Sequence, residues 1–303
     1  MTTDRYRSVM GRMQNGELIM IDGATGTEVE QRGVPQIENA WNSGGVMTHA
    51  DVVRQIHEDY IDAGAQVIIS NTFGASRHAL RDAGLEDHFE KINHDAVALA
   101  IEARDNLNAS GVLVAGGISY WSWSGYQPSL AEIRENGAIQ AKTMADAGAD
   151  LIMLEMMVDT DKMCALLEGV LTVELPVWVG FSCRRAEDGQ LILYGGEPLL
   201  DGVKALRGYG LPLISIMHTD VGCVSAALDL IRNEWDGFIG VYAHTGDFDE
   251  NDSSWIPGTG VSEAVFCDYA KQWREAGVNL IGGCCGVGVG YIERLAADLS
   301  RSG

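Results

Sequence analysis

The stretch HADVVRQIHEDYIDAGAQVIISNTF, residues 49–73, contains two patterns that together indicate the fold. Its first part places apolar residues at 52, 53, 56, 60, 61 and 63 with charges between them, which is typical of an amphipathic helix. Ala63-Gly64 is a typical helix stop. The apolar run QVIISNTF (66–73) then resembles a strand buried on both faces. The stretch therefore predicts one helix–strand step of a parallel α/β fold.

The same helix, Ala-Gly and strand sequence recurs at ADAGAD (145–150) and REAGVN (274–279). Eight apolar runs divide the chain: 18–23, 66–73, 112–119, 150–155, 177–183, 213–218, 238–244 and 279–285. Eight βα units in a chain of 303 residues predict a (β/α)8 TIM barrel. An open doubly wound sheet would have a switch point and usually fewer strands. No linker-like segment divides the chain, so a single domain over 1–303 is expected.

Composition and charge narrow the classes of function. Hydrophobic residues make up 46% and charged residues 21%, as in a globular protein with a core. The net charge is −22, with a pI near 4.5, which repels nucleic-acid phosphates and anionic membranes. We therefore expect small-molecule partners and neither nucleic acid nor membrane. A homo-oligomer remains an open possibility at this stage.

The compartment follows from the N-terminus, the apolar runs and the cysteines. The N-terminal segment has no apolar core of a signal peptide, and no run approaches the roughly 20 residues that span a bilayer. The six cysteines are scattered rather than spaced as a disulfide framework. A reduced, cytoplasmic protein is the expectation.

Barrel enzymes carry their chemistry where the strands end, at the C-terminal face. The polar residues that close the eight runs should therefore meet at one mouth. They are Asp22, Asn71, Thr72, Ser119, Glu155, Cys183, His218, His244, Cys284 and Cys285. Two carboxylates, two imidazoles and three thiols from separate places would then lie together.

The segment GGCCG (282–286) ends the last predicted strand with two adjacent thiols. A disulfide between sequence neighbours has poor geometry. Three interpretations remain: two metal ligands, a redox or nucleophilic thiol, or small residues that let a ligand approach. His218, Cys284 and Cys285 form a Cys2His set, which catalytic zinc uses with one position open. The flanking glycines permit the backbone kink that such a site needs.

The remaining cysteines and histidines carry weaker signals. Cys164, Cys223 and Cys267 fall in predicted helices and are expected to be packing residues, whereas Cys183 and His244 could belong to the mouth or to the wall. The other five histidines, at 49, 57, 78, 88 and 94, are expected to face solvent or cap helices.

Three further segments indicate a small-molecule site. DGATGTE (22–28) offers glycines and free N–H groups after the first strand. Glu155 ends an apolar strand, so it needs a cation, either a protein Arg or Lys or a substrate ammonium. SYWSWSGYQ (119–127) contributes Tyr120, Trp121, Trp123 and Tyr126, and Trp41 lies earlier in the chain. Aromatic faces attract onium ions, although such a loop could also simply pack its own rings.

DGATGTE, SNTFGAS (70–76), LEMM (154–157) and GGCCG, in this order, resemble the homocysteine S-methyltransferase family from about residue 18 to about residue 296. The resemblance implies a (β/α)8 barrel with a zinc ion. The ion binds one cysteine at the end of the sixth strand and two at the end of the eighth. It also implies that zinc holds homocysteine as a thiolate, which takes a methyl group from a sulfonium, quaternary ammonium or folate donor and gives methionine.

The resemblance assigns roles residue by residue. Cys284 and Cys285 match the zinc-binding pair, and Glu155 matches the carboxylate that binds the acceptor's ammonium. The remaining predicted substrate residues are Asp22, Gly23, Thr25, Trp41, Thr72, Trp121 and Trp123. Met217-His218 replaces the family's Asn-Cys, so the third zinc ligand would be His218; Tyr242-Ala243-His244 replaces Tyr-Pro-Asn.

Three hypotheses follow. The first is a zinc-dependent S-methyltransferase that uses a small onium donor, since one barrel leaves no room for folate and cobalamin domains. The second is a metal-free barrel with a redox or nucleophilic Cys-Cys loop. The third is a non-catalytic subunit that binds a thiol or a corrinoid.

Overall fold

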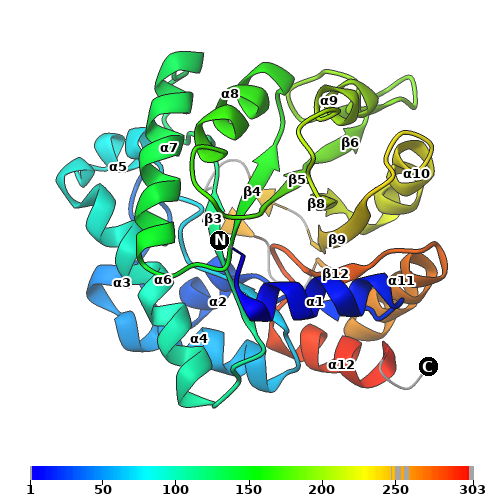
Figure 1. The fold of residues 1–303 in the computed structure, drawn as a ribbon, viewed down its shortest axis with the longest axis horizontal. Coiled ribbons are helices and arrows are strands. Elements are labelled where there is room, and N and C mark those ends of the chain that lie inside the picture. Colours follow the sequence, from blue (N-terminus) through cyan, green and yellow to red (C-terminus); the bar gives the residue numbers. More distant parts are fainter. Residues whose placement is uncertain (1, 247, 250–253, 256–258, 300–303) are drawn as a thin grey trace.

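The computed structural model describes residues 2–246, 248–249, 254–255 and 259–299, and it confirms the predicted barrel (Figure 1). Eight parallel strands pair in the order β1-β12-β9-β8-β5-β4-β3-β2. A parallel bridge between Ile21, just after β1, and Val67 joins the two ends of this order. Hydrogen bonds from Gln66 N–H to Met20 O and from Asp22 N–H to Val67 O complete the closure.

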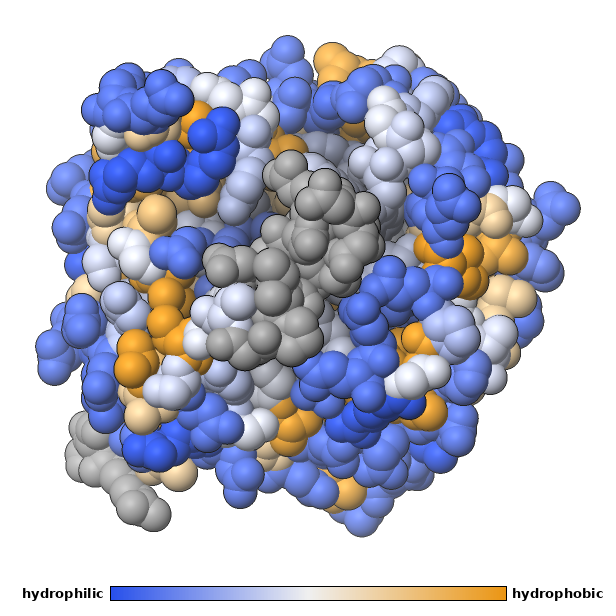
Figure 2. All heavy atoms as spheres, turned by 180° about the vertical axis from the view of Figure 1, so that it is seen from behind, coloured by the Kyte–Doolittle hydropathy of each residue, from blue (hydrophilic) through white to orange (hydrophobic). Residues whose placement is uncertain are grey.

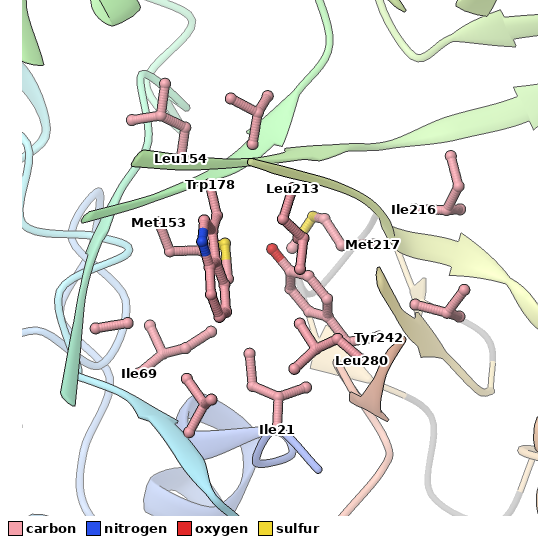
Figure 3. Packing of buried hydrophobic residues seen from close by; sticks show 14 of the residues in the cluster. Ile21, Ile69, Met153, Leu154, Trp178, Leu213, Ile216, Met217, Tyr242 and Leu280 are labelled. Carbon is pink, nitrogen blue, oxygen red and sulfur yellow. The ribbon is translucent and has the colours of Figure 1, made fainter. Parts of the chain in front are cut away.

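Each predicted apolar run coincides with one barrel strand, and β4 and β8 extend two residues beyond their runs. The strands are β1 (Ile19–Met20), β2 (Val67–Ile69), β3 (Leu113–Ile118), β4 (Leu151–Met157), β5 (Val177–Phe181), β8 (Leu213–Asp220), β9 (Phe238–His244) and β12 (Leu280–Gly283). Nearly all their residues are buried, because helices cover the outside and side chains fill the inside. Figure 3 shows the inside, where Trp178, Met153 and Tyr242 interdigitate with aliphatic side chains.

Helices surround the sheet (Figure 1). They are α1 (Asp4–Gln14), α2 (Thr25–Gln31), α3 (Gly45–Thr48), α4 (Ala50–Asp62), α5 (Arg77–Asp82), α6 (Phe89–Asn106), α7 (Leu130–Asp146), α8 (Thr160–Val170), α9 (Leu199–Ala205), α10 (Val221–Ile231), α11 (Glu263–Glu275) and α12 (Val289–Leu299), with a 3-10 turn at Glu86–His88. The three predicted stops end α4, α7 and α11. Gly64, Gly148 and Gly277 there have φ of +107°, +99° and +85°, a conformation that favours glycine.

Helix α1 covers the base of the barrel, opposite the strand ends that carry the predicted site (Figure 1). Trp178 Nε1 donates a hydrogen bond to the Tyr6 hydroxyl at 3.1 Å. The fully buried Asp150 accepts from Arg5, Thr3 and the Val114 N–H. A buried carboxylate needs such partners, so this cluster fixes α1 on the base.

The surface and the two hairpins complete the architecture. β6 (Cys183–Arg185) pairs antiparallel with β7 (Leu191–Leu193), and β10 (Phe248–Asp249) with β11 (Ser254–Trp255). The face in Figure 2 carries mostly hydrophilic residues between scattered apolar ones. Within the described ranges, none of the helices combines the length and apolar character that crossing a membrane requires.

Two histidines were wrongly expected to face solvent or cap helices. His78 is buried and its Nε2 lies 3.0 Å from the Trp121 carbonyl oxygen. His57 is fully buried in α4, and neither ring nitrogen has a hydrogen-bond partner among the described residues. Its position in the helix faces the core, as residues 53, 56 and 60 do. A single histidine in an amphipathic pattern does not reveal which face it occupies.

We expect His57 to make stability depend on pH. Burial lowers its pKa from 6.5 to about 4, so the unfolded chain takes up a proton before the folded chain does. The free energy of unfolding should therefore fall as the pH is lowered from 6.5 to 4. The total loss is up to about 3 kcal/mol, since each unit of pKa shift corresponds to about 1.36 kcal/mol. Urea unfolding at a series of pH values measures this loss.

The matched variants are His57→Leu and His94→Leu. His57→Leu should flatten the pH dependence between 6.5 and 4, whereas the exposed His94→Leu should retain it. An unchanged pH dependence in His57→Leu would contradict this assignment.

Candidate metal and substrate site

The ends of β8 and β12 bring three predicted residues together. Cys284 Sγ lies 3.5 Å from His218 Nδ1 and 3.9 Å from Cys285 Sγ. One ligand atom from each of the three residues lies within 4.8 Å of the others. Cys285 is buried, and the other two are half-buried.

Irregular backbone geometry orients the side chains of His218, Cys284 and Cys285 towards one another. His218 has φ of +41°, unusual for a non-glycine residue, and the β8–β9 register shifts between Met217 and Asp220. Bulges of this kind redirect side chains beside active sites. In the turn that carries Cys284 and Cys285, called the cysteine turn below, Cys284 N–H donates to Ala243 O, and Thr245 N–H donates to Cys285 O. A Cβ at Gly282 would lie 2.3 Å from Ile21 O, so only glycine lets the end of β12 pack this closely on the residue that follows β1.

Two of the three separations between the ligand atoms are close to those around one tetrahedral ion, and the third is within 4.8 Å. Zinc–sulfur and zinc–nitrogen bonds of about 2.3 and 2.05 Å at tetrahedral angles place ligands roughly 3.5–3.8 Å apart. The two short separations, 3.5 and 3.9 Å, are close to this range. Three protein ligands would leave one position for a substrate, as catalytic zinc requires.

The two thiols differ in acidity. The hydrogen bond between them, helped by His218, lowers the pKa of the Cys284 thiol well below its usual value. The same interaction and burial raise the pKa of Cys285 well above its usual value. One negative charge is thus favoured on the pair in the absence of a cation, whereas a divalent cation held by both sulfurs would bind them as two thiolates.

Two buried carboxylates belong to the same site. Asp22, which follows β1, accepts a hydrogen bond from the Ile69 N–H at 2.7 Å through Oδ2. Burial raises the pKa of both Asp22 and Glu155 well above the usual range; the charge of Cys284 adds to both shifts, and the charge of Asp22 adds to that of Glu155. Among the described residues, no Arg or Lys pairs with either carboxylate. The site therefore holds a deficit of positive charge.

Strand-end residues shape the space around Glu155. A Cβ at Gly117 would lie 2.5 Å from Glu155 Oε2 and 3.4 Å from Thr72 Oγ1, so Thr72 and Glu155 share this wall. The Thr72 hydroxyl donates to Gly117 O at 2.7 Å and is buried, which makes it a structural support. Gly23 and Thr25 lie in the turn that packs on Val287, where Ala24 N–H donates to Val287 O.

Three aromatic rings lie together beside this wall. Trp41 and Trp123 have centroids 6.4 Å apart, and Phe73 contacts both edge-on at 6.2 and 5.8 Å. All three rings are half-buried. Phe73 directly follows Thr72, which connects the ring cluster to the Glu155 wall. The sequence prediction missed Phe73, although its place at a strand end was a usable signal.

Three other candidates make hydrogen bonds within the fold. Trp121 does not join the ring cluster; its carbonyl accepts from His78. Tyr120 is buried, and its hydroxyl accepts the Val158 and Asp159 N–H groups after β4. Cys183 is buried and accepts a hydrogen bond from the Thr219 hydroxyl at 3.6 Å, away from the other two thiols.

His244 lies at the mouth rather than in the outer wall. Its ring centroid is 4.9 Å from that of His218. Burial first, then the charge of His218, lowers the pKa of His244 to about 4, so the ring is neutral at neutral pH. The cysteines at 164, 223 and 267 lie in α8, α10 and α11, as expected from the sequence.

Comparison with known proteins identifies the family. The family described as Homocysteine S-methyltransferase matches residues 19–299. Homocysteine S-methyltransferase of Escherichia coli (strain K12) is 30% identical over 294 residues, covering 89% of this chain and 91% of the relative. Homocysteine S-methyltransferase 2 of Zea mays is 24% identical, with 95% and 91% covered.

The fold comparison agrees. The metallated form of the homocysteine methyltransferase MmuM from Escherichia coli superposes with a TM-score of 0.80 at 25% identity, covering 97% of this chain and 99% of that one. The family match spans the whole barrel and includes the cysteine turn, both carboxylates and the ring cluster. This chain belongs to the homocysteine S-methyltransferase family.

Proposed function

We propose that this protein transfers a methyl group from a small sulfonium or quaternary ammonium compound to homocysteine or a closely related thiol amino acid, with zinc bound by His218, Cys284 and Cys285. Homocysteine would give methionine. The family membership supports the reaction class, and the spacing of the three ligand atoms supports the metal. A reduced, cytoplasmic setting is part of the proposal, because all six cysteines are free.

The proposed acceptor is inferred from two buried carboxylates that have no cation of the protein beside them among the described residues. Glu155 and Asp22 are 8% and 1% exposed and lack a protein cation among the described residues. A buried charge is costly unless it is paired. An amino acid that binds through its ammonium group supplies the missing positive charge, while its side-chain sulfur can reach the cysteine turn.

The chain's own residues position the acceptor and protect it from water. Bound zinc would lower the pKa of a substrate thiol, which is otherwise mostly protonated near neutral pH. Glu155 and Asp22 hold the ammonium end, and Gly23 lets the turn after β1 pack closely on Val287, since a Cβ there would lie 2.3 Å from the Val287 carbonyl oxygen. Attack then needs the donor methyl in line with the sulfur at about 3–3.5 Å.

The ring cluster of Trp41, Phe73 and Trp123 is the proposed donor subsite. Aromatic faces bind onium cations with about 0.5–2 kcal/mol each. The donor loses its positive charge as it reacts, so this attraction stabilises bound donor more than the transition state. The cluster therefore acts on the KM of the donor more than on kcat.

We expect methionine from homocysteine and at least one onium donor. The zinc-loaded chain, incubated with homocysteine and a panel of sulfonium and quaternary ammonium donors, is analysed by mass spectrometry. If none of the donors in the panel gives methionine, a non-catalytic thiol-binding subunit is favoured. Full activity of a reduced, metal-depleted chain would instead favour a nucleophilic Cys-Cys loop.

His218→Ala should reduce bound zinc from about one equivalent to well below it, because one of three protein ligands is lost. Elemental analysis of the purified chain under reducing conditions measures occupancy. His94→Ala, at an exposed histidine, is the control and should keep wild-type occupancy.

His218→Cys tests the same site in the opposite direction. A third thiolate should tighten zinc binding, seen as slower loss of metal to a chelator. Wild-type zinc content in His218→Ala would show that another residue completes the site.

Glu155→Gln should raise the KM for homocysteine about 10–100-fold, because a charge-assisted hydrogen bond of about 1.5–3 kcal/mol is lost. Initial rates at saturating donor measure this change. The exposed Glu168→Gln is the control. A KM for homocysteine equal to that of the wild type in Glu155→Gln would rule out the ammonium contact.

A further inference from the structure

Tyr242 of β9 carries a buried hydroxyl that the fold does not use. The residue is 2% exposed, and its hydroxyl has no hydrogen-bond partner among the described residues. Figure 3 shows the ring extending into the barrel, with its oxygen beside Met217. An unmade hydrogen bond of a buried hydroxyl costs about 1–3 kcal/mol, so folding alone does not account for it.

The hydroxyl lies beside the strand that carries Glu155. A Cβ at Gly180 would be 2.4 Å from the Tyr242 oxygen and 3.3 Å from Leu154 O, so the phenol reaches across the barrel to where β4 and β5 pair. In that pairing Leu154 is opposite Val179. Glu155 and Gly180 follow on each strand, and the register then shifts before Met157 pairs with Phe181, so the hydroxyl lies near the segment of β4 that carries Glu155.

The electrostatics agree with this placement. After burial, the negative charge that most raises the pKa of Tyr242 is that of Glu155, followed by Cys284 and Asp22. The phenol thus lies within the field of all three acidic groups of the site. It is a donor beside three acidic groups, and within the described chain none of them accepts its proton.

We propose that Tyr242 is a positioning residue of the acceptor pocket, whose hydroxyl donates a hydrogen bond to the Glu155 carboxylate when the substrate ammonium binds there. This inference rests on the proposed function. The bond fixes the carboxylate against the ammonium and favours its ionised form, since a hydrogen bond to a carboxylate stabilises the charge. Tyr242 therefore selects thiols that carry an α-ammonium group over thiols that lack one.

Tyr242→Phe removes only the hydroxyl and keeps the ring. The KM for homocysteine should rise about tenfold, consistent with a hydrogen bond of roughly 1.5 kcal/mol, with little change in kcat. The KM for 4-mercaptobutanoate, which is homocysteine without its amino group, should stay at the wild-type value. Thermal melting should show Tyr242→Phe at least as stable as wild type, because an unsatisfied hydroxyl has been removed.

Tyr6→Phe is the matched control, since it removes another buried phenol hydroxyl at the opposite end of the barrel. It should leave both KM values unchanged. An unchanged KM for homocysteine in Tyr242→Phe, an equal rise for both thiols, or a lowered melting temperature would each overturn the role of the phenol. A wild-type chain that neither binds homocysteine by calorimetry nor methylates it would instead overturn the proposed function.

Discussion

The parallel bridge between Ile21 and Val67 closes the sheet, and the site depends on this closure. An open sheet would leave β1 and β2 at opposite edges, far from each other. Once the ends meet, the Asp22 carboxylate accepts a hydrogen bond from the Ile69 N–H. The turn after β1 then packs on the cysteine turn. Residues separated by more than 250 positions in the chain then line one mouth.

Closure also concentrates negative charge. Asp22, Glu155 and the Cys284–Cys285 pair share a space from which water is largely excluded, and within the described residues no lysine or arginine enters it. Each group alone would be expensive to bury. Together they create a strong demand for cations, which a divalent metal and a substrate ammonium satisfy. Binding of a metal and of a substrate ammonium would therefore offset part of the free energy that burying these groups costs on folding.

The departure from the family pattern lies in two neighbouring strands. His218 lies two residues before the end of β8, where the sequence resemblance implies a cysteine, and His244 ends β9, with the two rings 4.9 Å apart. An imidazole ligand is neutral, so the proposed metal centre carries one negative charge less than a three-thiolate centre. His218 has a left-handed backbone, and its Nδ1 lies 3.5 Å from Cys284 Sγ.

The sequence by itself determined the eight strands, the barrel and the meeting of His218, Cys284 and Cys285, but not the position of Cys183. These follow from local rules: buried parallel strands are short apolar runs, Ala-Gly ends the helices, and strand ends of a barrel converge. Tertiary structure alone decided the burial of His57, the joining of Phe73 to Trp41 and Trp123, and the isolation of the Tyr242 hydroxyl. Each depends on what other segments place opposite the residue, because contacts across the barrel join positions with no relation in sequence.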